Sequence, residues 1–331
     1  MSAGRLVTIG LKACNQRVTI GAALEGVLSQ TYRPLEIVIS DDGSTDGTWE
    51  AIEGKTRGES AELGRRGVRL VVNRNEKNLG NMGNWLKICE LSQGEWIVKC
   101  DGDDVSERNR VKELVGAIDR AEARGLCPTV VSCGGVKIDL AGRVVGRFHA
   151  RSACYPLGAC MAFHRDCFTR FPRPKNSRIV DDEVFARRAL MLGDELRVDL
   201  PLVRYRLGSG ISSESSNVRQ AELRCMRQFP ESLAQCRRDL EAIRADIGES
   251  KYAEWTARLD YDGRQHAVSA TLLGSPRFGD RWRAYRALEK PPITAPYRWK
   301  LMLYLLPAPI GDFLLRRMTH LRRQCGKRRP G

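Results

Sequence analysis

Two groups of carboxylates in the sequence directly follow apolar runs. Asp41 and Asp42 come after the run Leu35–Ser40, and the segment Asp101–Asp104, which reads Asp-Gly-Asp-Asp, comes after Trp96–Cys100. Oxygen ligands at a sharp turn can hold a hard divalent cation while substrate phosphates complete its octahedron. Such a cation neutralises the charge that builds on a departing diphosphate. One acidic turn is more often a plain turn or helix cap, but two at one sheet edge favour a site.

A third acidic cluster, Asp181–Glu183, opens the apolar helical pattern Val184–Leu192. On its own this cluster is most simply explained as a helix N-cap. A carboxylate at the mouth of a helix, facing the other two clusters, can also act as general base toward an acceptor hydroxyl. The two roles are compatible, with capping by Asp181 and catalysis by Asp182.

The elements that must position these carboxylates alternate along the first half of the chain. The expected strands are Leu6–Leu11, Leu35–Ser40, Val68–Val72, Trp96–Cys100 and Thr129–Ser132, and the expected helices are Val18–Gln30, a short helix after Gly47, Asn81–Leu91 and Glu107–Ala123. This alternation predicts βαβ units and a mostly parallel sheet. Open parallel sheets bind ligands at the carboxyl ends of their strands. We therefore expect the first two acidic clusters to meet at one sheet edge.

Composition limits the class of protein. The chain has 331 residues, of which 42% are hydrophobic and 29% charged, and a formal net charge of +15. These values are typical of a globular protein, and the charge favours anionic partners such as nucleotide phosphates, lipid headgroups or nucleic acid. The eleven cysteines form no CxxC pair and the four histidines show no zinc spacing, which predicts reduced thiols. With no signal peptide recognisable, we expect a cytoplasmic location.

The last third of the chain has a different character. From about Asn217 to Leu259 it is charged and helical, and it ends in a basic tail that contains the apolar run Leu301–Leu306. No stretch of about 18 apolar residues is present, so a spanning helix is not expected. An apolar run beside basic residues can lie in a membrane interface, with Trp299 and Tyr304 at headgroup level. The alternative is a helix packed on the rest of the protein.

These residues, in this order, resemble the family-2 glycosyltransferases, which are inverting enzymes of the GT-A fold. The resemblance runs from about Leu6 to Ser213 and is most specific over Leu28–Thr48, which reads LSQTYRPLEIVISDDGSTDGT. Further matching pieces are Asn78–Gly80, Gly94–Ile97, Gly158–Phe163, and Asp181-Asp182 followed by Arg188. The resemblance implies an α/β, Rossmann-like GT-A catalytic domain at residues 1–216. A helical, basic extension at residues 217–331 would carry the membrane-associating tail.

The resemblance also implies roles for individual residues. Asp42 would bind the nucleotide base, Asp101 would lie near the ribose, and Asp103 would hold Mg²⁺ or Mn²⁺. Asp182 would be the base for a single in-line displacement that inverts the anomeric centre. Residues placed in the nucleotide site besides these are Thr8 and Asn15, and further candidates near the site are Lys12, Asp41, Asp104, Asp181 and Arg188.

The implied reaction moves a sugar from a nucleotide-diphosphate sugar to a saccharide or lipid-linked saccharide acceptor. It would take place in the cytoplasm or peripherally at the inner face of the membrane, on an anionic surface, with no nucleic acid as partner. A polymerase palm would also use Gly102-Asp103-Asp104, but the chain is short for one. The remaining alternative is a non-catalytic nucleotide-binding or membrane-scaffold protein of the same fold.

The sequence departs from the family at three places. Lys12–Asn15 reads Lys-Ala-Cys-Asn where Pro-x-Tyr-Asn is common, so the aromatic ring that can stack on the base is missing, and Lys12 is left to meet a phosphate or solvent. The usual Glu-Asp pair reads Asp181-Asp182. The segment Tyr205–Ser209 lacks the histidine that many relatives use as a further metal ligand. A metal would therefore depend more on the diphosphate and water.

Overall fold

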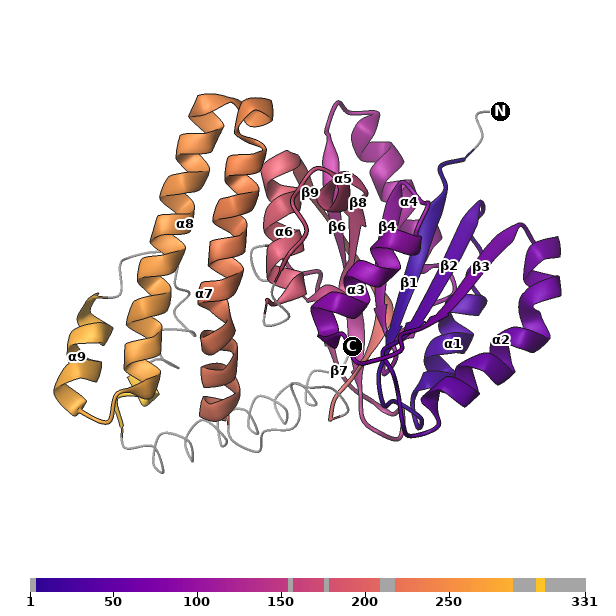
Figure 1. The fold of residues 1–331 in the computed structure, drawn as a ribbon, viewed down its shortest axis with the longest axis horizontal. Coiled ribbons are helices and arrows are strands. Elements are labelled where there is room, and N and C mark those ends of the chain that lie inside the picture. The colour runs from indigo at the N-terminus through magenta and orange to yellow at the C-terminus, as the bar shows by residue number, and fades with distance from the viewer. Residues whose placement is uncertain (1–3, 154–156, 176–178, 209–217, 288–301, 307–331) are drawn as a thin grey trace, which may run out of the picture.

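The computed structural model describes residues 4–153, 157–175, 179–208, 218–287 and 302–306. Within these residues, one mixed sheet carries helices on both faces, and a layer of long helices packs beside it (Figure 1). That layer lies next to α6, at the opposite end of the molecule from α2.

Over the described ranges, the sheet has nine strands in the order β3-β2-β1-β4-β8-β6-β9-β5, with β7 paired to β6. Strands β3, β2, β1 and β4 are parallel, β8 runs antiparallel between β4 and β6, and β9 is parallel to β6. The strands are β1 Val7–Ala13, β2 Leu35–Asp41, β3 Val68–Arg74, β4 Trp96–Asp101, β5 Val105–Ser106, β6 Pro128–Ile138, β7 Val144–Phe148, β8 Met161–His164 and β9 Asp194–Arg206. The five strands expected from the sequence are all present.

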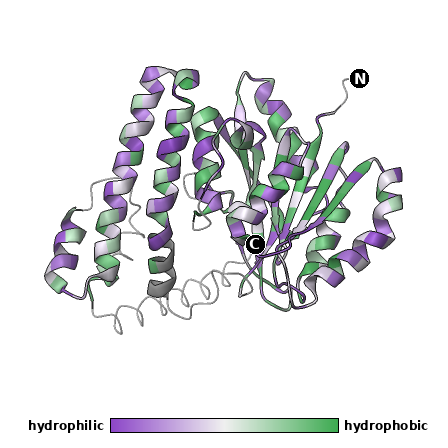
Figure 2. Cartoon of the chain, viewed as in Figure 1, coloured by the Kyte–Doolittle hydropathy of each residue, from purple (hydrophilic) through white to green (hydrophobic). Residues whose placement is uncertain are grey.

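Two hydrophobic clusters fill the two faces of the sheet. On one face pack α1 (Ile20–Leu28), α2 (Thr48–Arg65) and α4 (Arg110–Glu122). On the other face pack α3 (Gly80–Leu91), α5 (Asp166–Thr169) and α6 (Asp181–Leu192), followed by the long helices. Every residue of β1 and β2 is buried, because strands covered on both faces can be apolar throughout. Figure 2 shows the central strands mostly in green.

Side chains alternate between these two faces along a strand. In β4, Trp96, Val98 and Cys100 enter the cluster beneath α1 and α4, whereas Ile97 enters the cluster beneath α3 and α6. Lys99 is two residues beyond Ile97, so its side chain points to the same face of the sheet. The strand therefore carries a lysine toward α3 and α6.

The helical part comprises α7 (Val218–Ala242), α8 (Arg244–Gly274) and α9 (Phe278–Ala287). Cys236 and Leu240 of α7, with Trp255 and Leu259 of α8, join the core cluster that also contains α6. The helical character expected beyond Asn217 is confirmed. The helix after Gly47 is longer than expected, with 18 residues.

A small third core corrects one reading of the tail. Tyr304 is fully buried and packs with Leu272, Leu273 and Ala284, and the Arg281 guanidinium donates a hydrogen bond to the Leu305 carbonyl. Tyr304 therefore packs on the protein, as in the alternative, and does not lie at a headgroup surface. Trp299 and residues 307–331 lie outside the described residues.

Candidate active site

The carboxyl ends of three parallel strands meet at one edge of the sheet. In the strand register, Ala13 of β1 lies opposite Asp41 of β2, and Lys12 lies opposite Asp101 of β4. The third acidic cluster reaches the same edge, because Lys12 Nζ is 3.1 Å from Asp101 Oδ1 and 3.4 Å from Asp181 Oδ2. The structure thus brings the first two carboxylate clusters to one sheet edge, as the sequence predicted, and places the third cluster beside them.

The loop after β2 is held by its own aspartates. Asp41 accepts hydrogen bonds from the Ser44 backbone N–H (3.0 Å) and hydroxyl (2.5 Å), so it stabilises the turn. Asp42 Oδ1 accepts bonds from Asn75 Nδ2 (2.9 Å) and the Leu79 N–H (2.8 Å). Asp42 is thereby fixed at the sheet edge, where a ligand of an open sheet binds.

Asn15 links the loops after β1 and β2. Its backbone has φ of 50°, its N–H donates to the Ser44 hydroxyl (2.9 Å), and its Oδ1 accepts from the Thr45 N–H (3.0 Å). Asparagine is one of the few residues besides glycine that tolerates this left-handed conformation. Asn15 therefore shapes the loop beside Asp42.

Thr8 does not join this cluster, contrary to what the resemblance implied. It lies near the start of β1, where its hydroxyl donates to Glu36 Oε2 (2.5 Å) and accepts from the Gly94 N–H (3.0 Å). Four residues of extended chain, about 13 Å, separate it from Lys12. Thr8 holds the amino ends of the strands together, and we omit it from the nucleotide site.

The Asp101–Asp104 turn closes against the sheet. Burial raises the pKa of Asp101, but the charges of Lys12 and Lys99 outweigh this and lower it overall. Burial, together with the charges of Asp103 and Asp101, raises the pKa of Asp104 well above its usual range. Asp104 Oδ1 accepts a bond from the Arg206 N–H (2.7 Å), and Arg206 Nε donates to the Asp103 carbonyl (2.9 Å).

Asp181, at the first position of α6, does not cap the helix. The residue preceding the helix is Val180, and no side chain caps this end by a hydrogen bond. Asp181 instead receives Lys99 Nζ at 2.6 Å and Asn81 Nδ2 at 2.6 Å. Its pKa is lowered because Lys12 and Lys99 together outweigh the effect of burial.

Asp182 is the more accessible of the two carboxylates at the start of α6. Its side chain is 27% exposed, against 1% for Asp181. Its Oδ1 pairs with Lys99, and its Oδ2 accepts a bond from the Gly158 N–H at 3.0 Å. Burial raises its pKa, the Asp181 charge adds to this, and Lys99 opposes it. Of the pair, Asp182 is the carboxylate that a molecule in the site could reach.

Sequence reasoning missed Lys99, Asn75 and Asn81 as residues of the site. Lys99 is 2% exposed and bridges Asp181 and Asp182, while Asn81 contacts both Lys12 and Asp181. The available signal was a single lysine inside the apolar strand Trp96–Cys100, since a buried lysine needs a charged partner.

Arg188 lies away from the carboxylates. It forms a two-bond ion pair with Asp239 of α7, at 2.7 and 2.9 Å, and donates to the Cys167 and Pro172 carbonyls. Both side chains of the pair are buried. Arg188 therefore ties α6 to the helical part and does not touch the candidate site.

The residues present fit a divalent cation only if the substrate supplies much of its coordination. Among the residues that the structure describes, no three His, Cys, Asp or Glu side chains gather as a metal-binding group. Asp103 carries a hard carboxylate on the turn, and the nearby Asp101 is paired with Lys12. Mg²⁺ commonly binds through one or two carboxylates plus substrate phosphates and water. Such coordination needs no histidine ligand, and the segment Tyr205–Ser209 supplies none.

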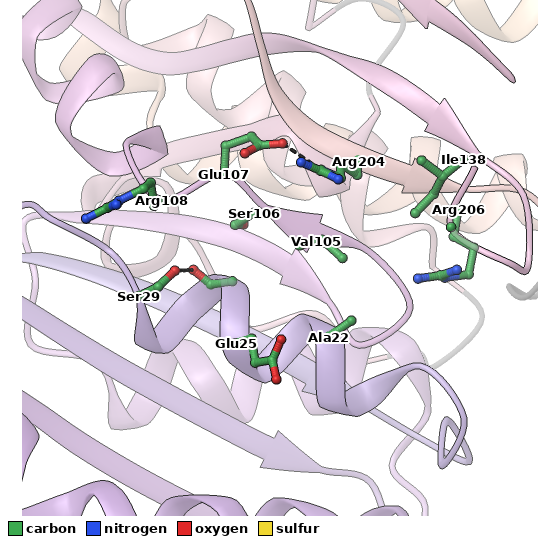
Figure 3. A pocket seen from close by; sticks show the side chains of 12 residues that line it. Ala22, Glu25, Ser29, Val105, Ser106, Glu107, Arg108, Ile138, Arg204 and Arg206 are labelled. Carbon is green, nitrogen blue, oxygen red and sulfur yellow. Dashed lines mark hydrogen bonds and ion pairs between the residues drawn. The ribbon is translucent and has the colours of Figure 1, made fainter. Parts of the chain in front are cut away.

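A separate open hollow of about 500 Å³ lies between α1 and strands β5 and β9, next to the Asp101–Asp104 turn (Figure 3). Its lining includes Glu25, Glu107, Arg204 and Arg206, and Arg204 Nε pairs with Glu107 Oε1 at 2.7 Å. Arg206 connects this hollow to the turn at Asp103 and Asp104, because its Nε donates to the Asp103 carbonyl and its N–H donates to Asp104 Oδ1. The three carboxylate clusters do not open into it.

Two further features concern the described cysteines and helices. Each cysteine whose side chain the structure describes is a free thiol, and most of these are buried. In the described ranges, no helix combines the length and apolarity needed to cross a membrane.

Residues 8–148 match the model of the family described as glycosyl transferase family 2. The chain carries a family 2 glycosyltransferase domain. This confirms the resemblance seen in the sequence.

The curated relatives of the chain include two named bacterial glycosyltransferases. The putative glycosyltransferase EpsE of Bacillus subtilis is 28% identical over 36% of this chain and 41% of EpsE. The Escherichia coli UDP-Glc:alpha-D-GlcNAc-diphosphoundecaprenol beta-1,3-glucosyltransferase WfaP is 35% identical over 30% of this chain and 36% of WfaP. The aligned part therefore spans about two-fifths of each relative.

Solved structures show the same fold over most of the chain. S. aureus TarS superposes with a TM-score of 0.54 at 16% identity, covering 93% of this chain and 53% of TarS. The mannosyltransferase PcManGT from Pyrobaculum calidifontis superposes with a TM-score of 0.51 at 19% identity, covering 93% of this chain and 86% of that one. The expected GT-A architecture with a helical C-terminal part is confirmed.

Proposed function

We propose that the protein transfers a sugar, with inversion, from a nucleotide-diphosphate sugar to a hydroxyl of a saccharide or lipid-linked saccharide. The observation that carries this proposal is the meeting of Asp42, Asp101 and Asp182 at one sheet edge of a family 2 domain. The Asp42 N–H bonds the Ala13 carbonyl at the end of β1, Asp101 lies opposite Lys12, and Asp182 contacts Lys99 of β4. A buried lysine paired to two carboxylates at that edge supports a catalytic role over a non-catalytic protein of the same fold.

The donor would lie across the carboxyl ends of β1, β2 and β4. In this proposal Asp42 and Asn15 face the base, Asp101 faces the ribose, and Asp103 holds Mg²⁺ or Mn²⁺. The cation would supply charge neutralisation for the departing diphosphate. Two solved complexes of proteins with this fold support this ligand class: the S. aureus TarS fragment 1–349 with UDP-GlcNAc, and PcManGT with GDP-Man and Mn²⁺.

Asp182 would accept the proton of the attacking hydroxyl. The C–O bond to the acceptor then forms as the bond to the diphosphate breaks, and the leaving electron pair stays on the diphosphate. Asp182 is preferred over Asp181 because its side chain is 27% exposed, whereas Asp181 is 1% exposed. Both oxygens of Asp181 already receive donors from Lys99 and Asn81.

A lipid-linked acceptor would place the protein at a membrane surface, and α9 supports this part of the proposal. Phe278 and Trp282 stack at 6.4 Å and are 59% and 44% exposed. Arg277, Arg283 and Arg286 are exposed beside them. Aromatic rings on a basic helix favour an anionic interface, and the name of WfaP specifies a diphosphoundecaprenol acceptor. Greater co-sedimentation with anionic than with zwitterionic vesicles would support this location, and equal co-sedimentation would contradict it.

A thermal-shift panel of nucleoside diphosphates, with and without Mn²⁺, tests the donor site. A ligand at 100 times its Kd stabilises the folded state by about 2.7 kcal/mol. We expect one nucleotide to raise Tm in a metal-dependent manner. Asp103→Ala should abolish the metal dependence and metal-dependent turnover. Asp182→Asn should retain the shift but lose transfer by at least about 100-fold.

Each outcome distinguishes an alternative. If no nucleotide raises Tm, the non-catalytic alternative gains support. If Asp182→Asn retains near-normal transfer, the base is a different carboxylate, and Asp181 and Glu183 become the candidates. Product release without an acceptor would indicate hydrolysis of the donor in place of transfer.

A further inference from the structure

Five buried or half-buried charges form an alternating chain across the candidate site. Asp101 pairs with Lys12, Lys12 with Asp181, Asp181 with Lys99, and Lys99 with Asp182. The two lysine side chains are 8% and 2% exposed. Because an isolated buried ion is costly, each of these groups depends on its neighbours to remain charged.

Lys99 occupies the central position between the two carboxylates of α6. Its Nζ lies 2.6 Å from Asp181 Oδ2, contacts Asp182 Oδ1, and lies 5.6 Å from the centre of the Trp85 ring. Strand β4 is buried and paired on both sides, with β1 and β8. The ammonium group is therefore presented from a rigid element.

Asp182 is held from a second side by η1 (Gly158–Cys160), because the Gly158 N–H donates to Oδ2. One carboxylate oxygen thus faces β4 and the other faces η1. These two contacts fix the plane of the carboxylate. The quarter of the side chain that remains exposed is the part an acceptor can reach.

We propose that Lys99 is a positioning residue of this reaction, and that its ammonium group holds the Asp182 carboxylate ionised and oriented toward the acceptor. The inference rests on the proposed function. Asp181 would anchor the lysine in turn, so that Lys99 retains a carboxylate partner after Asp182 takes up the acceptor proton.

Among the described residues, the charged groups that act on Asp182 come from three elements. Lys99 and Asp101 come from β4, Lys12 comes from β1, and the neighbouring Asp181 and Glu183 come from α6. The Gly158 N–H of η1 is a neutral donor to the same carboxylate. Burial raises the pKa of Asp182, and Lys99 is the strongest opposing charge. Without Lys99, burial and the two aspartates would favour the protonated carboxyl group, which cannot act as a base.

The test is the pH dependence of kcat/KM for transfer, in wild type and in Lys99→Met. We expect the acidic limb to move upward by at least about one pH unit, which is a loss of about 10-fold at a pH below the limb. Raising the pH should restore part of the activity, while donor KM changes little. Lys99→Arg keeps the charge, so its limb should stay near that of wild type even if kcat falls.

A charge-neutral variant guards against a purely structural effect. Lys99→Met combined with Asp181→Asn removes one charge of each sign, so its acidic limb should return toward wild type. The role of Lys99 is overturned if the acidic limb of the kcat/KM profile lies at the same pH in Lys99→Met as in wild type. It is also overturned if the acidic limb of the double variant moves as far upward as that of Lys99→Met. If Lys99→Met does not fold, the neutral double variant and Lys99→Arg carry the comparison.

Failure of the proposed function gives a different result. If wild-type protein transfers sugar from none of the donors that raise its Tm, the transferase proposal fails before any variant is compared. If wild type transfers sugar and the limb is insensitive to residue 99, only the present inference fails.

Discussion

Replacing Arg188 by methionine separates a structural role from a catalytic one. Arg188 is 1% exposed and Asp239 is fully buried, and two hydrogen bonds join them. The guanidinium also lies 4.9 Å from the Phe171 ring centre and 5.1 Å from that of Phe185. The substitution would leave the Asp239 carboxylate buried with Gln235 as its remaining side-chain donor.

The expected loss follows from this burial. Removing one partner of a buried ion pair costs about 3–5 kcal/mol, because the other charge remains without its counter-ion. For a chain of 331 residues, an unfolding entropy of about 2.1 cal/mol/K per residue converts this to a fall in Tm of about 4–7 °C. Scanning calorimetry measures the shift directly, and the nucleotide-induced rise in Tm shows whether the donor site is intact.

Two further variants make the result decisive. Arg65→Met breaks an exposed pair with Glu62, with side chains 74% and 55% exposed, and should change stability by less than about 0.5 kcal/mol. Arg188→Met with Asp239→Leu removes both charges and should recover much of the loss. A Tm of Arg188→Met within 1 °C of wild type, roughly the scatter expected of a surface change, would refute the structural role. Lost transfer at unchanged Tm would return Arg188 to the active site.

Two other substitutions test the site and its surroundings. In Gly158→Ala the new Cβ would overlap the Asp182 carboxylate, so kcat for transfer should fall by about 10- to 100-fold. The control is Gly146→Ala, in which the new Cβ would meet its nearest atom at 4.0 Å. This variant should retain activity in the same assay. The half-buried His266 stacks on Phe229 at 4.4 Å, and burial lowers its pKa. The unfolded state then binds more protons, so this contribution to stability is present above the unfolded-state pKa and is lost as pH falls through the folded-state pKa. His266→Phe should therefore lose less Tm than wild type between pH 7.5 and 5, a range set by the ordinary histidine pKa of about 6.5, and parallel Tm curves would contradict this.

The sequence by itself determined the strand–helix alternation and the edge at which the acidic clusters meet. Apolar strands such as Leu35–Ser40 predicted burial on both faces, and β2 is buried throughout. Acidic residues directly after two parallel strands had to share one edge, because parallel strands end on the same side of a sheet. These are local patterns, and local patterns can be read without coordinates.

Only the tertiary structure decided which charges contact one another. The pairing of Lys99 with Asp181 and Asp182 joins residues more than 80 positions apart, and Arg188 turns toward α7 instead of the site. Thr8 matched the family segment by its place in the chain but lies at the far end of its strand, and Tyr304 is buried in a core that the tail's composition did not reveal. Which partner a charge or an aromatic ring finds depends on packing between distant elements, because desolvation makes an unpaired buried group costly wherever it stands in the sequence.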